Sequence, residues 1–358
     1  MATDSTVEFR LAGPDDVAAV GPLLLDLGGA SFPERFTGKT ISDFCRWKYF
    51  GNPSGNALVG AAVASGRIVS LVVATPKRVQ VGSDLHLAFE LGDFITAPEY
   101  RKQGMFSQLI ELVCAEAQQR SGSFAYVRPN EISFPILVSR LSFVEIHNIA
   151  DRRYFLPSLV IHRKLGIPSD LTRASGVDGI MRKLVLPSSS ASITVMPVDR
   201  FGHEVDDLWE RMRGKYEFSL ARTSSYLNWR YVDSPTRYLL WVAHRSGQVA
   251  GYLVGFISDS ELRGHIVDLF CDPKDVSTAA ALVRTSMEAM LESGVHAIST
   301  WVLPAKDESA CGRVLTHAFP RVGRPLLHFV MRFLDASLDG SRLPASRWRL
   351  ASGDFDGI

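Results

Sequence analysis

The sequence has little cysteine, and its few cysteines are scattered. Cys45, Cys114, Cys271 and Cys311 include no CxxC pair, and no cluster of histidines has metal-ligand spacing. We therefore expect neither a disulfide framework nor a zinc site, a pattern that fits a reducing compartment. Cys114 falls on the apolar side of a predicted helix and is expected in the core.

An excess of charge of either sign is also missing. Lys and Arg number 39 against 38 Asp and Glu, which leaves a formal net charge of +1. This balance argues against a protein that coats nucleic acid, so no nucleic-acid partner is expected. The polar start, Met1–Thr6, is not a signal peptide pattern, and no apolar run approaches the roughly 20 residues that span a bilayer. We expect a cytoplasmic protein without a membrane span, and the sequence leaves a homo-oligomer open.

A chain of 358 residues suits two domains. Glycine, proline and serine interrupt the middle of the chain, where the regular patterns of apolar residues stop. We predict a first domain over residues 1–156, a linker over 157–191, a second domain over 192–336 and a loosely ordered tail over 337–358.

The first half shows alternating and helical patterns in turn, which predict the order β-α-α-β-β-β-α-β-α-β. The second half restarts with a strand and a helix and continues with two strands, a helix, a strand and a helix. The expected class is therefore α/β with mixed sheets.

The most informative stretch is Glu90–Ser107. It predicts a strand ending at Pro98, a basic turn over Arg101–Gly104, and a helix from about Phe106 with apolar residues at three- and four-residue spacing. A helix that begins after such a turn presents free backbone N–H groups and the positive end of its dipole. The stretch therefore predicts a phosphate or pyrophosphate site.

Pro98–Gly104 resembles the acyl-CoA-binding motif of the GCN5-related N-acetyltransferase (GNAT) superfamily, whose fold has the same element order; Phe106 stands where that family usually has a small residue. The resemblance implies an acyl-CoA co-substrate, acetyl-CoA or longer, and no metal. It implies pyrophosphate binding by Arg101, Lys102, Gln103, Gly104, Met105, Phe106 and Ser107, and pantetheine pairing along Phe94, Ile95 and Thr96.

The catalytic base is expected on the strand before this turn. Glu90 holds the position of the GNAT carboxylate, and a carboxylate in so apolar a strand is costly unless it is partnered or functional. Asp93 is the alternative, because a β-bulge of the kind that this family often has would bring both acids to one site. Either acid can instead make a structural hydrogen bond, and His86 is a weaker candidate.

The general acid for the thiolate is left open. GNAT enzymes often use a tyrosine where this chain has Val138. Solvent, Ser133, Ser139 or Tyr126 are the alternatives. Asn130 and Ser133 resemble a turn of a GNAT branch that acts on sugars and cell-envelope precursors, where it lies beside pantetheine. A helix cap formed by the same two residues is the competing interpretation.

An internal repeat links the two halves. Trp47 and Tyr49 recur as Trp229 and Tyr231, each pair followed by proline. This predicts two related units in tandem. The second unit has Pro273–Ala279 in place of the basic turn, without Gly or Arg, so we expect it to lack the CoA site. Because the aromatic pair recurs in both units, we favour a packing role for it.

Together these features predict an N-acyltransferase that moves an acyl group from CoA to a primary amine. The sugar-branch resemblance favours an amino sugar as this small-molecule acceptor, including a nucleotide-linked one. A peptide or antibiotic amine and a non-catalytic acyl-CoA-binding scaffold remain alternatives. A Fem-type aminoacyl transferase would need a long helical arm, which the sequence lacks.

Overall fold

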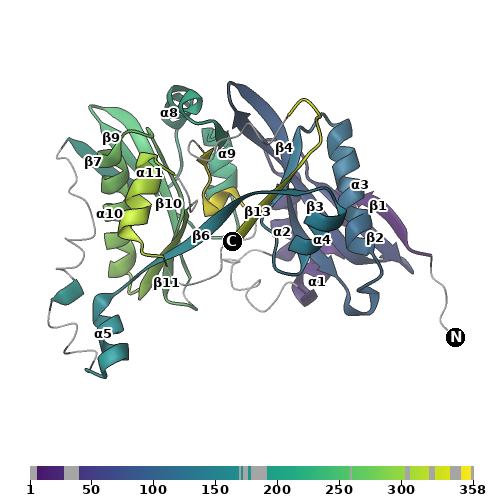
Figure 1. Ribbon diagram of the computed structural model, residues 1–358, viewed down its shortest axis with the longest axis horizontal. Helices are drawn as coiled ribbons and strands as arrows, with labels where there is room; N and C mark the ends of the chain where they lie inside the picture. The colour runs from purple at the N-terminus through teal and green to yellow at the C-terminus, as the bar shows by residue number, and fades with distance from the viewer. Residues whose placement is uncertain are drawn as a thin grey trace.

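The computed structural model describes residues 6–27, 40–168, 171, 176–178, 192–258, 260–302, 307–321, 327–338 and 348–355. Across these residues the strands form a 14-stranded mixed sheet with the order β1-β2-β3-β4-β5-β13-β6-β12-β11-β10-β9-β7, with β8 and β14 attached beside β3. Figure 1 shows α3 and α4 over one end of this sheet and α10 and α11 over the other. The α/β class expected from the sequence is confirmed.

The first half has the predicted element order. Its strands are β1 (Glu8–Ala12), β2 (Leu58–Ala64), β3 (Arg67–Val81), β4 (Asp84–Thr96), β5 (Phe124–Val127) and β6 (Val144–Phe155). Its helices are α1 (Val17–Leu27), α2 (Ile41–Cys45), α3 (Met105–Gln119), α4 (Ser133–Arg140) and α5 (Pro157–Leu165), with short turns η1 (Pro14–Asp16), η3 (Arg46–Phe50) and η4 (Pro98–Tyr100).

The second half repeats much of this order and adds strands that the sequence did not predict. Its strands are β7 (Ile193–Val198), β8 (Phe218–Leu220), β9 (Leu239–Arg245), β10 (Gln248–Ser258), β11 (Arg263–Cys271), β12 (Ala297–Val302), β13 (Leu327–Phe333) and β14 (Trp348–Arg349). Its helices are α8 (Glu204–Met212), α9 (Ser224–Leu227), α10 (Val276–Glu292) and α11 (Ala310–Ala318), with η5 (Arg213–Lys215), η6 (Asn228–Val232) and η9 (Ser352–Asp354). The unpredicted strands are β8, β9, β13 and β14.

Alternation along β3 separates two cores in the first half. Val72 and Ala74 pack with the apolar side of α3, including Cys114, which is buried as predicted. Leu71 and Val73 point to the other face and pack with α1 and α2. Because successive strand residues face opposite sides, one apolar strand holds helices on both faces of the sheet. Burial also raises the pKa of the Cys114 thiol to about 12.

The repeat extends to details of pairing. β4 pairs with β5 in parallel, and β11 pairs with β12 in parallel. Both β4 and β11 carry a bulge against their antiparallel neighbour, at Asp93–Phe94 and at Val267. The two halves therefore share their strand order, one parallel strand pair and a bulge at the same place.

The last strands of the two halves are exchanged. β13, from the second half, lies between β5 and β6, so it pairs with first-half strands on both sides. β6, from the first half, pairs with β13 over Val144–Ile149 and with β12 over Ala150–Phe155. Each half thus completes its sheet with a strand from the other, and the sheet is continuous between them.

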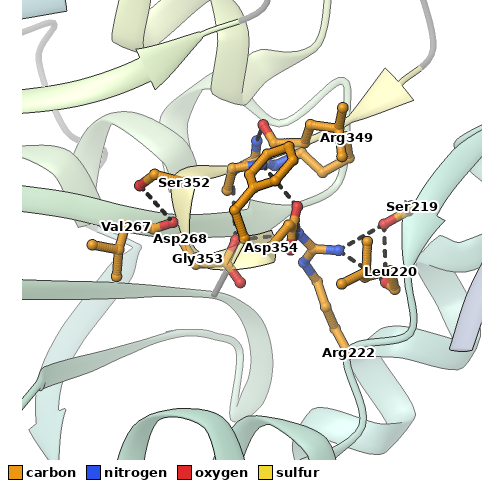
Figure 2. A network of polar contacts seen from close by, with 12 residues as sticks. Ser219, Leu220, Arg222, Val267, Asp268, Arg349, Ser352, Gly353 and Asp354 are labelled. Carbon is orange, nitrogen blue, oxygen red and sulfur yellow. Dashed lines mark hydrogen bonds and ion pairs between the residues drawn. The ribbon is translucent and has the colours of Figure 1, made fainter. Parts of the chain in front are cut away.

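Residues 348–355 are buried, although a loosely ordered tail was expected over 337–358; residues 339–347 and 356–358 lie outside the described residues. Trp348, Asp354 and Phe355 are each at most 2% exposed. Asp354 accepts two hydrogen bonds from the buried guanidinium of Arg222, both of 2.9 Å, and this pair lies beside Asp268 (Figure 2). The charged Asp354 of this segment is paired with Arg222 inside the protein. Composition alone does not reveal this pairing, so the segment was predicted to be exposed.

Candidate acyl-CoA and amine site

The first feature of the site is a gap in the sheet between β4 and β5. These strands pair in parallel only from Ala88 with Phe124 to Glu90 with Tyr126. Beyond Glu90, β4 continues to Thr96 while paired with β3 alone. The edge of β4 that faces β5 is therefore free of strand pairing just after Glu90, and an extended ligand can pair with it there.

A β-bulge shapes β4 at this gap, as anticipated. Gly92 lies opposite Val73 and Ile95 lies opposite Leu71, so two residues of β4 face one of β3. The extra residue is Asp93, whose φ of 50° is in the left-handed region. A non-glycine residue in this conformation is strained, and such positions concentrate at functional sites.

Asp93 is already bound by two side chains. Its Oδ2 atom lies 2.7 Å from Nζ of Lys48 and accepts a hydrogen bond of 2.8 Å from the hydroxyl of Tyr49. Both partners come from η3, the turn that carries the repeated aromatic pair. Asp93 therefore fixes η3 against the bulge, which is the structural hydrogen bond that the sequence left as an alternative to catalysis.

Glu90 lies deeper, at the point where β4 and β5 part. It is 4% exposed, and its Oε2 atom lies 3.5 Å from Nζ of Lys77, which is fully buried. The Lys77 ammonium also donates to the hydroxyl of Tyr226 at 3.3 Å and lies 5.3 Å from the ring centroid of Trp229. The second half thus contacts the cation that is paired with the candidate base.

The predicted anion turn forms between β4 and α3. Lys102 and Gly104 have φ values of 63° and 80°, and Gly104 is the N-cap of α3 with no side chain capping the helix. The exposed Arg101 donates from Nε to the carbonyl oxygen of Thr96 at 3.0 Å. The free amides of the first turn of α3 and the guanidinium beside them suit a phosphate group.

The corresponding helix of the second half is closed to an anion. The N-cap of α10 is Asp275, whose side chain accepts a hydrogen bond of 3.1 Å from the backbone N–H of Thr278. Asp275 also pairs with Arg245 at 2.9 Å. A carboxylate of the chain itself occupies the place where α3 has free N–H groups, so the two halves differ in the way that the sequence indicated.

Phe94, Ile95 and Thr96, the residues expected along pantetheine, lie in the part of β4 that is not paired with β5. Phe94 packs edge-on against Phe106 with ring centroids 5.1 Å apart. The hydroxyl of Thr96 lies 2.8 Å from that of Ser70, which also bonds to the carbonyl of Ile95. Phe106, the departure from the usual small residue, thereby closes one side of the space beside β4.

Asn130 and Ser133 cap α4. The side-chain oxygen of Asn130 accepts from the backbone N–H groups of Ile132 and Ser133, at 3.0 and 2.9 Å. The hydroxyl of Ser133 accepts from the backbone N–H of Asn130 at 3.2 Å. Of the two interpretations kept open for this pair, the helix cap is the one that the contacts display.

The other acid and base candidates lie apart from Glu90 or are engaged elsewhere. Tyr126 is fully buried, and its hydroxyl donates to the carbonyl of Asp354 at 3.4 Å. Ser139 is exposed and donates to its own helix. His86 lies near the start of β4, 3.0 Å from the hydroxyl of Ser123. Tyr126 is nevertheless the residue of β5 that pairs with Glu90. Val138 is an exposed residue of α4.

Three residues of the site were missed from the sequence: Lys77, Arg128 and Tyr226. Lys48 was kept, with Arg46, as a possible contact to a phosphate of the acceptor. Lys77 had only a weak signal, because Arg78 follows it and Thr75 and Gln80 lie on the same strand. Tyr226 had none, since it lies 149 residues from Lys77. The packing role favoured for Trp47 and Trp229 is confirmed, because their rings stack at 5.4 Å.

The described residues contain no group of three or more His, Cys, Asp or Glu side chains placed to hold a metal ion. None of the helices in the same part of the chain has the length and apolar character needed to cross a membrane. The charged and hydrogen-bonding groups at the site are Glu90, Lys77, Asp93 and the uncapped N-terminus of α3.

Comparison with known proteins agrees with this geometry. Residues 25–137 match the family model of an acetyltransferase (GNAT) domain. No curated protein sequence matches the chain. A conserved Enterococcus faecalis protein of unknown function, described as a probable N-acyltransferase, is similar in structure, with a TM-score of 0.61 and 13% identity over 92% of this chain and 73% of that one.

Two further structures are similar over the same span. A GCN5-related N-acetyltransferase from Anabaena variabilis has a TM-score of 0.61 at 11% identity, covering 92% of this chain and 73% of its own. Saccharomyces cerevisiae N-myristoyltransferase with bound myristoyl-CoA has a TM-score of 0.57 at 12% identity, covering 92% and 80%. Residues 25–137 thus match a GNAT acetyltransferase domain, and the chain shares its fold with these structures.

Proposed function

We propose that the protein transfers an acyl group from acyl-CoA to a primary amine, with Glu90 as the general base. The observation that carries the proposal is that β4 and β5 separate just beyond Glu90. The same strand leads into the uncapped N-terminus of α3. If the pantetheine arm of acyl-CoA pairs along β4 and its pyrophosphate binds at residues 101–107, the thioester carbonyl would lie beside the buried carboxylate of Glu90.

The reaction is a direct displacement. Glu90 takes a proton from the acceptor ammonium, directly or through water, and the amine nitrogen attacks the thioester carbonyl carbon. Backbone N–H groups of β4 within Phe94–Thr96 would stabilise the oxyanion. The attacking nitrogen then loses its second proton to solvent, the C–S bond breaks and an amide forms. CoA leaves as a thiolate, which takes up a proton from solvent. Asp93 is the alternative base, although Lys48 already neutralises it.

We assign CoA binding to the first half and a shaping role to the second. The first half contains the anion turn, whereas Asp275 caps the corresponding helix of the second half. Tyr226 and Trp229, from the second half, hold Lys77 against Glu90. The acceptor is therefore expected to meet both halves.

For the acceptor we favour an amino sugar, including a nucleotide-linked one. The support is the resemblance of Asn130 and Ser133 to the sugar-acting branch, together with a site walled by two domains. The acyl group is acetyl or larger. One structural neighbour binds myristoyl-CoA, so chains up to that length belong in the test.

The test combines binding and turnover. Acyl-CoAs from acetyl to myristoyl are added to the full chain, and the melting temperature is measured; at least one should raise it. Thiol release is then followed with a panel of amino sugars, nucleotide-linked amino sugars, peptides and antibiotic amines. No shift with any acyl-CoA would rule out acyl transfer. A rise in melting temperature without thiol release would favour the non-catalytic acyl-CoA-binding scaffold. Thiol release with peptides alone would show that the acceptor is a peptide amine and not an amino sugar.

A further inference from the structure

Two cations act on Glu90, and they differ in how they are held. Lys77 is paired with Glu90 and bonded to Tyr226. Arg128, the residue directly after β5, also interacts electrostatically with Glu90. The carbon at the centre of its guanidinium lies 4.9 Å from the ring centroid of Trp301, a residue of β12. Arg128 therefore lies at the opening between β4 and β5, beneath a ring from the second half.

The guanidinium of Arg128 lacks the partners that a partly buried arginine normally has. Its Nε atom is closed off from solvent, and no acceptor for it occurs in the described part of the chain. Trp301 offers a π face but no hydrogen-bond acceptor. Burial lowers the pKa of Arg128, and Glu90 opposes this effect. A desolvated cation without hydrogen bonds is costly, so a site that keeps one is prepared for a ligand.

The other buried arginines make the contrast clear. Arg222 bonds to both carboxylate oxygens of Asp354 at 2.9 Å. Arg349 donates to the carbonyl oxygens of Leu269 and Leu350, each at 2.7 Å. The terminal N–H groups of Arg222 and Arg349 are bonded within the fold, although the Nε atom of Arg222 also lacks an acceptor among the described residues. The Arg128 guanidinium makes no hydrogen bond within the described residues, and it is the one beside the candidate base.

The balance of charged side chains at the site also favours an anionic ligand group. The site residues Lys48, Lys77, Arg128, Glu90 and Asp93 comprise three cations and two carboxylates. Lys48 pairs with Asp93, and Lys77 pairs with Glu90, which leaves the charge of Arg128 uncompensated. An anionic group on a ligand would complete the balance.

We propose that Arg128 binds an anionic group, a carboxylate or a phosphate, of the acceptor whose amine is presented to Glu90. This inference rests on the proposed acyl transfer. Trp301 covers one face of the planar guanidinium, which leaves the N–H groups at its edge to bind two oxygens of the anion side by side. Amino acids and phosphorylated amino sugars share this chemistry, an amine together with an anion, and neutral amines lack it.

The test uses two matched pairs of acceptors with the full chain and acetyl-CoA. Glucosamine 6-phosphate is compared with glucosamine, and glycine with glycinamide, by thiol release. The anionic member of at least one pair should have a kcat/KM at least about tenfold higher, the effect of one charge-assisted hydrogen bond. The pair that shows the preference identifies phosphate or carboxylate as the group.

Arg128→Met should remove this preference, mainly through the KM of the anionic acceptor, while the KM of acetyl-CoA is unchanged. Arg128→Lys should restore part of it, because the charge returns without the planar fork. Arg140→Met, at an exposed arginine of α4, is the matched control and should behave as wild type. The melting temperature of Arg128→Met should equal or exceed that of wild type, since an unsatisfied cation is removed.

A marked fall in that melting temperature would assign Arg128 to the fold and overturn the inference. Equal rates for both members of each pair, or no reaction with either pair while other amines react, would also overturn it and leave acyl transfer standing. If acyl-CoA binds but no amine of any kind releases thiol, the proposed function fails, and the inference fails with it.

Discussion

Trp47 and Trp229 each donate the indole N–H to the main-chain carbonyl of the other, at 2.6 and 2.9 Å. Their rings stack with centroids 5.4 Å apart and an interplanar angle of 26°. The two residues hold equivalent places in the repeat, so the contact is reciprocal, like that across a two-fold axis. The repeated aromatic motif is thus the contact that joins the two halves beside the site.

The first prediction concerns this pair. Trp47→Phe and Trp229→Phe each keep an aromatic ring but remove one hydrogen bond. Each should lower the free energy of unfolding by about 1 kcal/mol, because a main-chain carbonyl at the contact loses its indole donor. The free energy of unfolding lost in the double variant should differ from the sum of the two single losses, because the two residues are in contact. Urea unfolding followed by fluorescence measures this, and strict additivity would contradict the coupling.

The second prediction separates the two carboxylates. Glu90→Gln should lower kcat by about 100-fold or more, the usual contribution of a general base, with little change in acyl-CoA affinity. Asp93→Asn should act chiefly on stability, because it leaves Lys48 buried without its carboxylate. The measurements are thiol release and the melting temperature of each variant. A loss of rate confined to Asp93→Asn would move the base to that residue.

The third prediction tests the anion turn. Gly104 has a φ of 80°, so an alanine there is strained even though its Cβ would meet only the end of Gln108, at 3.8 Å. Gly104→Ala should weaken acyl-CoA binding about tenfold by displacing the free amides of α3, and Gly104→Glu should abolish it by adding charge repulsion. Isothermal titration with acetyl-CoA measures both. Gly66→Ala, also at a positive φ but in the β2–β3 turn, should leave binding intact.

The fourth prediction is a dependence of stability on pH. Burial lowers the pKa of His147, whose ring meets Trp348 edge-on at 4.9 Å. The unfolded chain therefore takes up a proton at this histidine near pH 6.5, where the folded chain resists it. The contribution of His147 to stability is present above that pH and is lost as the pH falls below it.

His147→Gln should accordingly flatten the decline of the melting temperature between about pH 7 and 5. The matched control is His203→Gln, because the side chain of His203 is 94% exposed. If the control flattened the profile as much as His147→Gln, the buried histidine would not be the cause.

The fifth prediction concerns the buried C-terminal segment. Asp354→Asn leaves Arg222 with a weaker partner and should destabilise the protein by about 3–5 kcal/mol, the cost of breaking a buried ion pair. Asp335→Asn changes the same residue type at an exposed position and should cost little more than the lost turn contact. Calorimetry of the full chain compares them. A small effect of Asp354→Asn would mean that the segment contributes little to the fold.

Much of the site could be predicted because its signals are local. The turn before α3 shows in the Arg101–Gly104 motif, and Glu90 is conspicuous as an acid in an apolar strand. The bulge that lifts Asp93 out of register was anticipated from the family resemblance rather than from the residues. The role of Asp93 is decided by its contacts with Lys48 and Tyr49. These contacts form only when η3 packs against β4, and no local sequence pattern predicts that packing.

The parts that were missed depend on long-range pairing. The sequence of Leu327–Phe333 is apolar and would suit a strand in many positions of a sheet. It therefore does not indicate that β13 lies between β5 and β6. Residues 348–355 were expected to be part of a solvated tail, and three of them, Arg349, Ser352 and Asp354, are polar. The burial of Asp354 is stabilised by Arg222, which is distant in the sequence. Arg128 was missed because Trp301 is contributed by the other half.

The exchange of β6 and β13 has a consequence for how the chain can be divided. A fragment ending after α5 would expose the edge of β5 and carry β6 without β12 or β13 beside it, so it should aggregate rather than fold. The two fragments produced by a cut between α5 and β7 should instead find each other and assemble, since each supplies the strand that the other needs. The protein is therefore suited to split-fragment complementation, with acyl transfer as the signal of reassembly.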